Sequence, residues 1–282
     1  HKNPLVADTY EPGSTFKVFV MAAALHEGLV TPDTRCDDCS GPITIGQYTV
    51  RTWDNHYNPR LTMTETIQHS DNTGMVFVGQ KLGKDQLWEY LDKFGLGSPT
   101  GIDLQEESSP QLRPANKWAD IDLATTSFGQ GIAVTGIQML RAVAAIANQG
   151  KLMEPRLVDQ VVGDTAITIK PKLVRQVVSP QTAQIITDMM VNAVDRGEAQ
   201  WTKLKGYSIA GKTGTAQIPV AGHYDQEKTI ASFVGFAPTD HHKFAMIVKL
   251  REPQSSPWAA ETAAPLWMSI AKDLLLYYNI PP

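Results

Sequence analysis

A serine and a lysine lie three residues apart near the start of the chain, within the segment EPGSTFK at residues 11–17. Residues with this spacing share one face of a helix, so the Ser14 hydroxyl and the Lys17 amine are expected to be neighbours. A serine is a weak nucleophile until a neighbour takes its proton, and a lysine can do so only as the neutral amine. Burial or a nearby cation favours that neutral form. About one such pair is expected by chance in a chain of this size. Whether this pair is catalytic therefore depends on whether other motifs of the chain supply the remaining catalytic groups.

A Lys-Thr-Gly triplet late in the chain is the most specific motif that could partner this pair. It spans residues 212–214, is followed by Thr215, and lies on a predicted strand. Fewer than about one chain in ten of this length would contain it by chance. An edge strand offers unpaired backbone groups to an extended peptide, and Gly214 would let that peptide approach closely. A third motif, Ser70-Asp71-Asn72, follows a short predicted helix.

The elements that position these motifs belong to an α+β fold. A helix over residues 14–27, ended by Gly28, carries the serine and the lysine. Capping-box patterns at Thr62 and Thr135 start two more helices. Periodicity predicts helices over 73–82, 84–94, 180–193 and 260–278, a hairpin over 41–50, a β excursion over 157–178, and strands over 208–217, 230–237 and 244–250. Helices gathered in the middle with strands at the end favour an antiparallel sheet flanked by helices, with a helical subdomain.

Length and composition describe an ordinary globular chain. Its 282 residues are 42% hydrophobic and 19% charged, with a net charge of −4. We therefore expect a single domain over residues 1–282 and no nucleic-acid partner. The longest apolar run, residues 18–25, is too short to cross a bilayer, so the chain as given is expected to be soluble. It begins with His1, close to Ser14, and we expect a fragment of a longer protein whose anchor lies upstream.

Cys36 and Cys39 form a Cys-x-x-Cys motif whose chemistry the sequence leaves open. Such a pair can be a disulfide, two free thiols or half of a metal site, and two cysteines alone do not complete a zinc site. Asp54 and His56 follow in the sequence and could supply the remaining ligands. A structural zinc therefore stands as an alternative to a disulfide or free thiols.

Three motifs occur in a fixed order: Ser14-x-x-Lys17, Ser70-x-Asn72 and Lys212-Thr213-Gly214. This set resembles the signature of the penicillin-recognising serine acyltransferases. Residues 10–17 and the glycine-framed turn at 127–131 (SFGQG) are similar to class B penicillin-binding proteins, the monofunctional peptidoglycan transpeptidases of cell elongation and division. The resemblance covers nearly the whole chain and implies a β-lactamase/transpeptidase-like fold.

The resemblance implies a role for each motif residue. It makes Ser14 the nucleophile that attacks the penultimate D-alanine carbonyl of a stem peptide, with Lys17 as the base. Ser70 would relay protons to the leaving D-alanine, and Lys212 would hold the hydroxyl network. The substrate would be bound by Asn72, Thr213, Gly214 and Thr215, and the backbone N–H groups of Ser14 and Thr215 would form the oxyanion hole. Asp71 is expected to be structural, because the family varies at that position.

The same resemblance implies partners and a location. No cofactor is required for this chemistry, and β-lactam antibiotics would acylate the same serine. The parent protein would be anchored in the cytoplasmic membrane, act on its outer face and pair with a glycosyltransferase. Family members carry β-strands ahead of the serine helix, which here must lie upstream or be absent. The cysteine segment is not a general family feature, although some elongation-type members are thought to carry a metal there.

Related activities remain as alternatives to peptidoglycan cross-linking. A serine β-lactamase shares the motifs but must hydrolyse its acyl-enzyme. Glu106 and Glu107 lie in a loop that lacks the Glu-x-x-x-Asn spacing expected of a class A enzyme. A D,D-carboxypeptidase would use water in place of the acceptor amine, and a sensor domain would bind β-lactams without turnover. The intact motifs favour an enzyme over a sensor.

Overall fold

The structure, a computed structural model, describes residues 2–220 and 223–282. Its helices are α1 (Pro4–Ala7), α2 (Lys17–His26), α3 (Met63–Gln68), α4 (Asn72–Lys93), α5 (Asp120–Ser127), α6 (Gly136–Ala147), α7 (Pro180–Arg196) and α8 (Ala263–Tyr277), with 3₁₀ segments η1 (Gly13–Phe16), η2 (Ala115–Lys117) and η3 (Gln200–Thr202). Its strands are β1 (Thr9–Tyr10), β2 (Ile43–Ile45), β3 (Tyr48–Val50), β4 (Val134–Thr135), β5 (Lys151–Met153), β6 (Gln160–Val162), β7 (Ala166–Thr168), β8 (Leu173–Gln176), β9 (Ala210–Val220), β10 (His223–Ala237) and β11 (Phe244–Arg251). Helices around antiparallel strands confirm the predicted α+β class.

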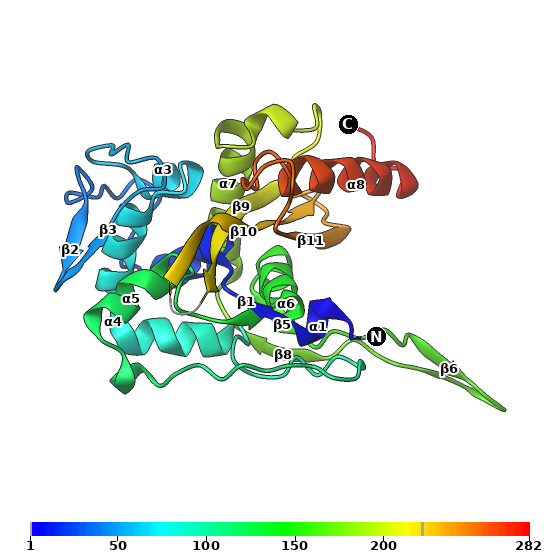
Figure 1. Ribbon diagram of the computed structural model, residues 1–282. Coiled ribbons are helices and arrows are strands. Elements are labelled where there is room, and N and C mark those ends of the chain that lie inside the picture. Colours follow the sequence, from blue (N-terminus) through cyan, green and yellow to red (C-terminus); the bar gives the residue numbers. More distant parts are fainter. Residues whose placement is uncertain (1, 221–222) are drawn as a thin grey trace.

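The largest sheet among the described residues is antiparallel, in the order β11-β10-β9, and helices cover both of its faces (Figure 1). Successive side chains of β10 point to opposite faces. Phe233 packs against Trp267 of α8, with ring centroids 5.0 Å apart, whereas Val234 and Phe236 join the main core. Helix α6 contacts β10 and β11 from the side opposite α8. Strand β9, which carries the Lys-Thr-Gly triplet, is an edge strand of this sheet, as predicted.

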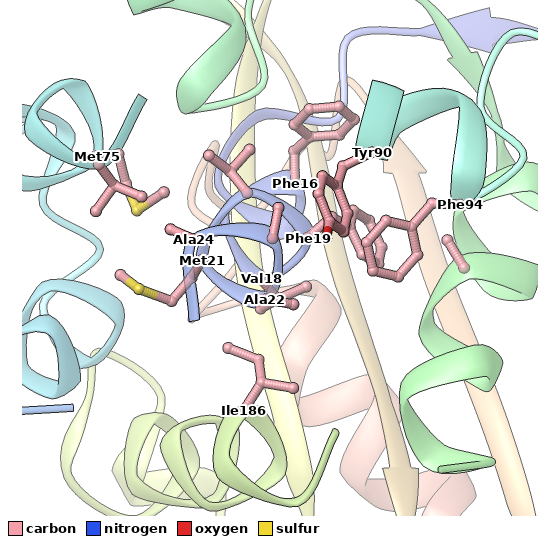
Figure 2. Packing of buried hydrophobic residues seen from close by; sticks show 14 of the residues in the cluster. Phe16, Val18, Phe19, Met21, Ala22, Ala24, Met75, Tyr90, Phe94 and Ile186 are labelled. Carbon is pink, nitrogen blue, oxygen red and sulfur yellow. The ribbon is translucent and has the colours of Figure 1, made fainter. Parts of the chain in front are cut away.

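Helix α2 runs through the centre of the molecule and is surrounded by apolar side chains (Figure 2). Its sequence, KVFVMAAALH, has no polar face, and a helix that is apolar all round belongs in a core. Phe19 packs against Phe94 at the end of α4, with ring centroids 5.1 Å apart, and α7 brings Ile186 to another side of the helix. Gly28, with φ of +68°, follows the end of α2, as predicted.

Several other local predictions are confirmed. Thr62 caps α3 and Thr135 caps α6, each through a reciprocal capping box. Helix α4 is interrupted at Gly83, where φ is 75° and ψ is 168°, so the two predicted helices meet at a sharp break. Strands β2 and β3 pair as the predicted hairpin.

Among the differences between the structure and the prediction are the start of α2 and the presence of α5. Ser14 lies in the 3₁₀ turn η1 and not in the first turn of an α-helix, because α2 begins only at Lys17. Helix α5 is not indicated by periodicity, since only Leu123 and Ala124 on it are buried apolar residues.

The predicted β excursion over residues 157–178 is present, and its β6–β7 hairpin projects away from the rest of the molecule (Figure 1). Strand β8, at the end of the same stretch, pairs with β5. Within the described ranges, no helix combines the length and the apolar character needed to cross a membrane.

Candidate active site

The three motifs, which lie far apart in the sequence, meet at one cleft of about 520 Å³. Ser14 comes from η1, Ser70 from the turn between α3 and α4, and Lys212 from β9. The cleft is lined by Ser14, Ser70, Asn72 and Thr215, among others. Lys17 and Lys212 are buried beneath it, and both amines donate hydrogen bonds to Ser70 Oγ. The fold therefore brings together the nucleophile and the amines that the sequence singled out.

Two glycines allow the turn that carries Ser14 to pack closely against its neighbours. Gly129 has φ of +83°, and a Cβ there would lie 2.1 Å from the carbonyl oxygen of Gly13. The Gly13 N–H donates to the Gly129 carbonyl at 3.0 Å. On β9, a Cβ at Gly214 would lie 2.8 Å from Thr15 Cγ2 and 3.0 Å from the Pro12 oxygen. Gly214 is thus needed for contact with the nucleophile's turn, a reason that the sequence did not indicate.

Gly129→Ala is expected to lower the free energy of unfolding by about 3 kcal/mol or more, because the new methyl would overlap backbone atoms that cannot rotate away. Gly28→Ala is the matched control. Gly28 also has a positive φ, of +68°, but no atom lies within 4 Å of its Cβ position, so only the backbone cost of about 1 kcal/mol is expected. Urea unfolding of both variants measures the difference, and equal losses would contradict this account of Gly129.

The Lys17 amine is fully buried and donates to three oxygen atoms of the second motif. The distances are 2.5 Å to the Ser70 carbonyl oxygen, 2.8 Å to Asn72 Oδ1 and 3.3 Å to Ser70 Oγ. Among the described residues no hydrogen bond joins this amine to Ser14, which lines the cleft. Ser70 and Asn72, which both line the cleft, therefore connect the buried amine to it.

Two physical causes favour the neutral amine of Lys17. Burial is the larger, and the positive charge of Lys212 adds to it, so that the pKa of Lys17 falls to about 7 although Asp71 and Glu198 act in the opposite direction. Burial also lowers the pKa of Lys212, again opposed by Glu198. The structure thus supplies both conditions, burial and a nearby cation, under which a lysine can accept a proton near neutral pH.

The Ser70-Asp71-Asn72 motif forms a tight turn between α3 and α4. Ser70 has φ of +56°, a left-handed conformation that is uncommon for a residue with a side chain. Buried Asp71 accepts from Thr73 Oγ1 at 2.6 Å and from the Gly74 N–H at 2.8 Å, which caps α4 and confirms its predicted structural role. The Asn72 amide donates to the Arg51 carbonyl at 2.9 Å. These bonds fix the turn so that Ser70 Oγ meets both lysines.

The hydroxyl groups of Thr213 and Thr215, in and next to the third motif, have different hydrogen-bond partners. Thr213 Oγ1 accepts from Lys212 Nζ at 3.1 Å and donates to Glu198 Oε2 at 3.2 Å. Thr215 Oγ1 accepts from the Ala259 N–H at 3.0 Å. Glu198 is a functional candidate that the sequence did not reveal, because a single glutamate just after a helix has no recognisable pattern.

Two tryptophans from separate loops form an aromatic wall of the cleft. Trp53 follows β3 and Trp258 precedes α8, and their ring centroids lie 5.3 Å apart. Both rings are about half exposed. In the sequence, neither residue can be distinguished from an ordinary surface aromatic in a loop.

The predicted metal ligands do not form a metal site. Cys36 and Cys39 are joined by a disulfide, which removes both thiolates as zinc ligands. Asp54 and His56 are exposed, and the His56 backbone N–H donates to Asp54 Oδ1 at 3.0 Å. No group of three or more His, Cys, Asp or Glu side chains with metal-site geometry occurs in the described part of the chain. Of the alternatives that the sequence left open, the structure has the disulfide.

These groups together can perform acyl transfer. A serine hydroxyl in an open cleft can attack a carbonyl carbon, and a neutral buried amine linked through a second serine can accept and return the proton. The turn of Ser14 packs closely against strand β9, because a Cβ at Gly214 would lie 3.0 Å from the Thr15 backbone nitrogen.

A family model described as "Penicillin binding protein transpeptidase domain" matches residues 1–275 of the chain. Among similar curated proteins, stage V sporulation protein D of Bacillus subtilis is 36% identical over 287 residues, covering 100% of this chain and 44% of that protein. Peptidoglycan D,D-transpeptidase FtsI of Buchnera aphidicola is 31% identical and covers 100% of this chain and 48% of that protein. The chain therefore spans less than half the length of these relatives.

Solved structures show the same fold. Penicillin-binding protein 3 of Mycobacterium tuberculosis, in a complex with aztreonam, superimposes with a TM-score of 0.92 at 32% identity, covering 99% of this chain and 65% of that one. The transpeptidase domain of penicillin-binding protein 3 from Burkholderia pseudomallei gives a TM-score of 0.90 at 30% identity, covering 100% of this chain and 83% of that one. The fold implied by the motifs is thereby confirmed.

Proposed function

Because this chain belongs to the penicillin-binding protein transpeptidase family, we propose that it forms an acyl-enzyme on Ser14 and cross-links peptidoglycan stem peptides. The observation that carries the proposal is the meeting of both lysine amines at Ser70 Oγ, directly beneath the cleft that Ser14 lines. The curated relatives named as D,D-transpeptidases support the reaction class, and the mycobacterial complex with aztreonam supports β-lactams as ligands of the cleft.

The proposed first step is attack of Ser14 Oγ on the penultimate D-alanine carbonyl of a donor peptide. The serine proton passes to the neutral Lys17 amine, and the N–H groups of Ser14 and Thr215 hold the oxyanion. The peptide bond to the terminal D-alanine then breaks, and Ser70 relays a proton to the leaving amine. Lys212 fixes Ser70 Oγ for this transfer at 3.0 Å.

In the second step an amine of a neighbouring stem peptide attacks the acyl-enzyme. A new amide bond forms, the bond to Ser14 Oγ breaks, and the proton lost by the amine returns to the serine through the same groups. A β-lactam enters by the first step alone, because its amide is opened by Ser14 and its leaving amine stays attached.

No observation favours a β-lactamase over this function. Glu107 accepts from the backbone N–H groups of Thr100 and Gly101, at 2.6 and 3.3 Å, and so stabilises its own loop. Neither Glu106 nor Glu107 lines the cleft. Both carboxylates are therefore poorly placed to activate a water for deacylation.

We further propose that the parent protein works on the outer face of the cytoplasmic membrane, anchored there and paired with a glycosyltransferase that supplies glycan strands. The reason is chemical, since stem peptides on newly made strands are the substrate of the reaction. Relatives named as peptidoglycan D,D-transpeptidases support a role of the parent protein in cell-wall synthesis.

Incubation with a fluorescent penicillin tests the proposal. We expect one covalent label per chain, located at Ser14 by peptide mass spectrometry and stable for many minutes. Transfer of a donor peptide to a labelled D-amino acid would then separate transpeptidation from hydrolysis by water. Absence of any label would overturn the acyl-enzyme, and rapid loss of the label would indicate a β-lactamase.

A further inference from the structure

We propose that Glu198 is a specificity-determining residue that competes with a ligand's carboxylate for the hydroxyl of Thr213. The inference rests on the proposed function, in which that hydroxyl helps to bind the carboxylate of the stem peptide or of a β-lactam. Glu198 lies between the end of α7 and η3, and it lines the cleft that also contains Ser14.

The Thr213 hydroxyl accepts one hydrogen bond and donates another. Lys212 Nζ donates to Thr213 Oγ1 at 3.1 Å, and Thr213 Oγ1 donates to Glu198 Oε2 at 3.2 Å. A hydroxyl has one proton to donate. In this arrangement the proton of Thr213 is already used by a carboxylate of the protein itself.

The backbone places Glu198 firmly, whereas its side chain is exposed. The preceding Gly197 donates to the Ala193 carbonyl at 3.0 Å at the end of α7. A Cβ at Gly197 would lie 2.3 Å from that same oxygen and 2.7 Å from the Gln68 carbonyl oxygen, so the chain is tightly enclosed there. The carboxylate can therefore turn away from Thr213 when a ligand arrives, while its attachment point stays beside the cleft.

A ligand carboxylate at Thr213 must accordingly displace Glu198 and remain near its negative charge. A neutral analogue meets no charge repulsion from Glu198, and it depends less on the Thr213 hydroxyl because a neutral oxygen is a weaker acceptor than a carboxylate. Glu198 should therefore weaken the preference of the cleft for carboxylates relative to neutral analogues. Screening by solvent limits the effect of one exposed charge to about fivefold.

An opposing effect acts through the protonation of the two buried lysine amines. The negative charge of Glu198 favours the protonated forms of Lys212 and Lys17, and Asp71 acts in the same direction on Lys17. A charged Lys212 would attract a ligand carboxylate. We place direct competition first, because Glu198 contacts Thr213 itself, whereas it contacts neither amine among the hydrogen bonds of the described residues.

The test compares acylation by benzylpenicillin and by its methyl ester, which differ only in the carboxylate. The measured quantity is the ratio of the two second-order acylation rates. In Glu198→Gln this ratio is expected to rise about fivefold in favour of the free acid, with the ester rate little changed. Glu198→Ala, which also removes the acceptor, should raise the ratio at least as much.

Glu261→Gln is the matched control, because Glu261 also lines the cleft and is exposed, but no hydrogen bond among the described residues joins it to Thr213. In this variant the ratio of the two acylation rates should stay within about twofold of the ratio for the parent protein. Thermal unfolding should show that all variants are folded. A ratio that is unchanged in Glu198→Gln, or that falls because Lys212 has lost its charge, would overturn the competition. Failure of the parent protein to react with either compound would overturn the proposed function instead.

Discussion

Ser14→Ala should lose covalent labelling by penicillin completely while remaining as stable as the parent protein. The variant lacks the only oxygen that the proposed reaction acylates, so the acylation rate should fall by about 10⁴-fold or more. Ser14 is only partly buried, and its hydroxyl has no hydrogen bond among those of the described residues. Its removal should therefore change the free energy of unfolding by less than about 1 kcal/mol.

Two measurements decide this prediction together. Labelling with fluorescent penicillin gives the loss of acylation, and urea unfolding gives the stability. Unlabelled but fully folded protein is the expected result. Loss of labelling with loss of folding would identify Ser14 as a structural residue, and residual labelling at another side chain would contradict its assignment as the nucleophile.

Lys17→Met should slow acylation by about 10³-fold, because it removes the group that accepts the serine proton while keeping the apolar volume of the side chain. In the parent protein the acylation rate should rise with pH and level off above about 7, where burial and Lys212 place the pKa of Lys17. Lys205→Met, at an exposed position, is the control and should keep the parent's rate. A pH profile of the acylation rate for the parent and both variants tests this expectation. A parent profile that is flat between pH 6 and 8 would argue against Lys17 as the base.

The same substitution should change how stability depends on pH. The pKa of Lys17 is lowered from its ordinary value in the folded protein, so between about pH 7 and 10 the unfolded chain binds a proton that the folded chain does not. The parent's stability relative to Lys17→Met should therefore increase with pH across that window, by at most about 1.4 kcal/mol per pH unit. Below pH 7 the difference should be constant. Urea unfolding at pH 6, 7, 8 and 9 measures the slope.

Local signals explain why most of the fold could be predicted. Thr62 and Thr135 carry complete capping boxes, and Gly28 and Gly83 have the positive φ angles that interrupt or end a helix. Such features depend on a few neighbouring residues and can be read from them. The start of α2 could not be placed, because η1 exists through contacts with Gly129 and Gly214, which are distant in the sequence.

The candidate active site likewise has residues that local motifs predict and residues that only contacts in the folded chain reveal. The three sequence motifs pointed to Ser14, Lys17, Ser70 and Lys212 as catalytic residues. The structure brings these four residues together at the cleft. The role of Glu198 could not be predicted from the sequence, because it depends on a hydrogen bond with Thr213 that only the folded structure reveals. The spacing of the Cys-x-x-Cys motif is compatible with a disulfide, with free thiols or with half of a zinc site, and the structure shows the disulfide.

The close packing of η1 between Gly129 and Gly214 has a consequence for folding kinetics. The nucleophile's turn receives its final geometry only after residues more than one hundred and about two hundred positions downstream have reached it. Closing such long loops makes these contacts late and slow to form, so Ser14 should become reactive only when nearly the whole chain has folded. Pulse labelling with penicillin during refolding would then report the last stage of assembly, and a truncated chain lacking β9 would be inert however much helix it retained.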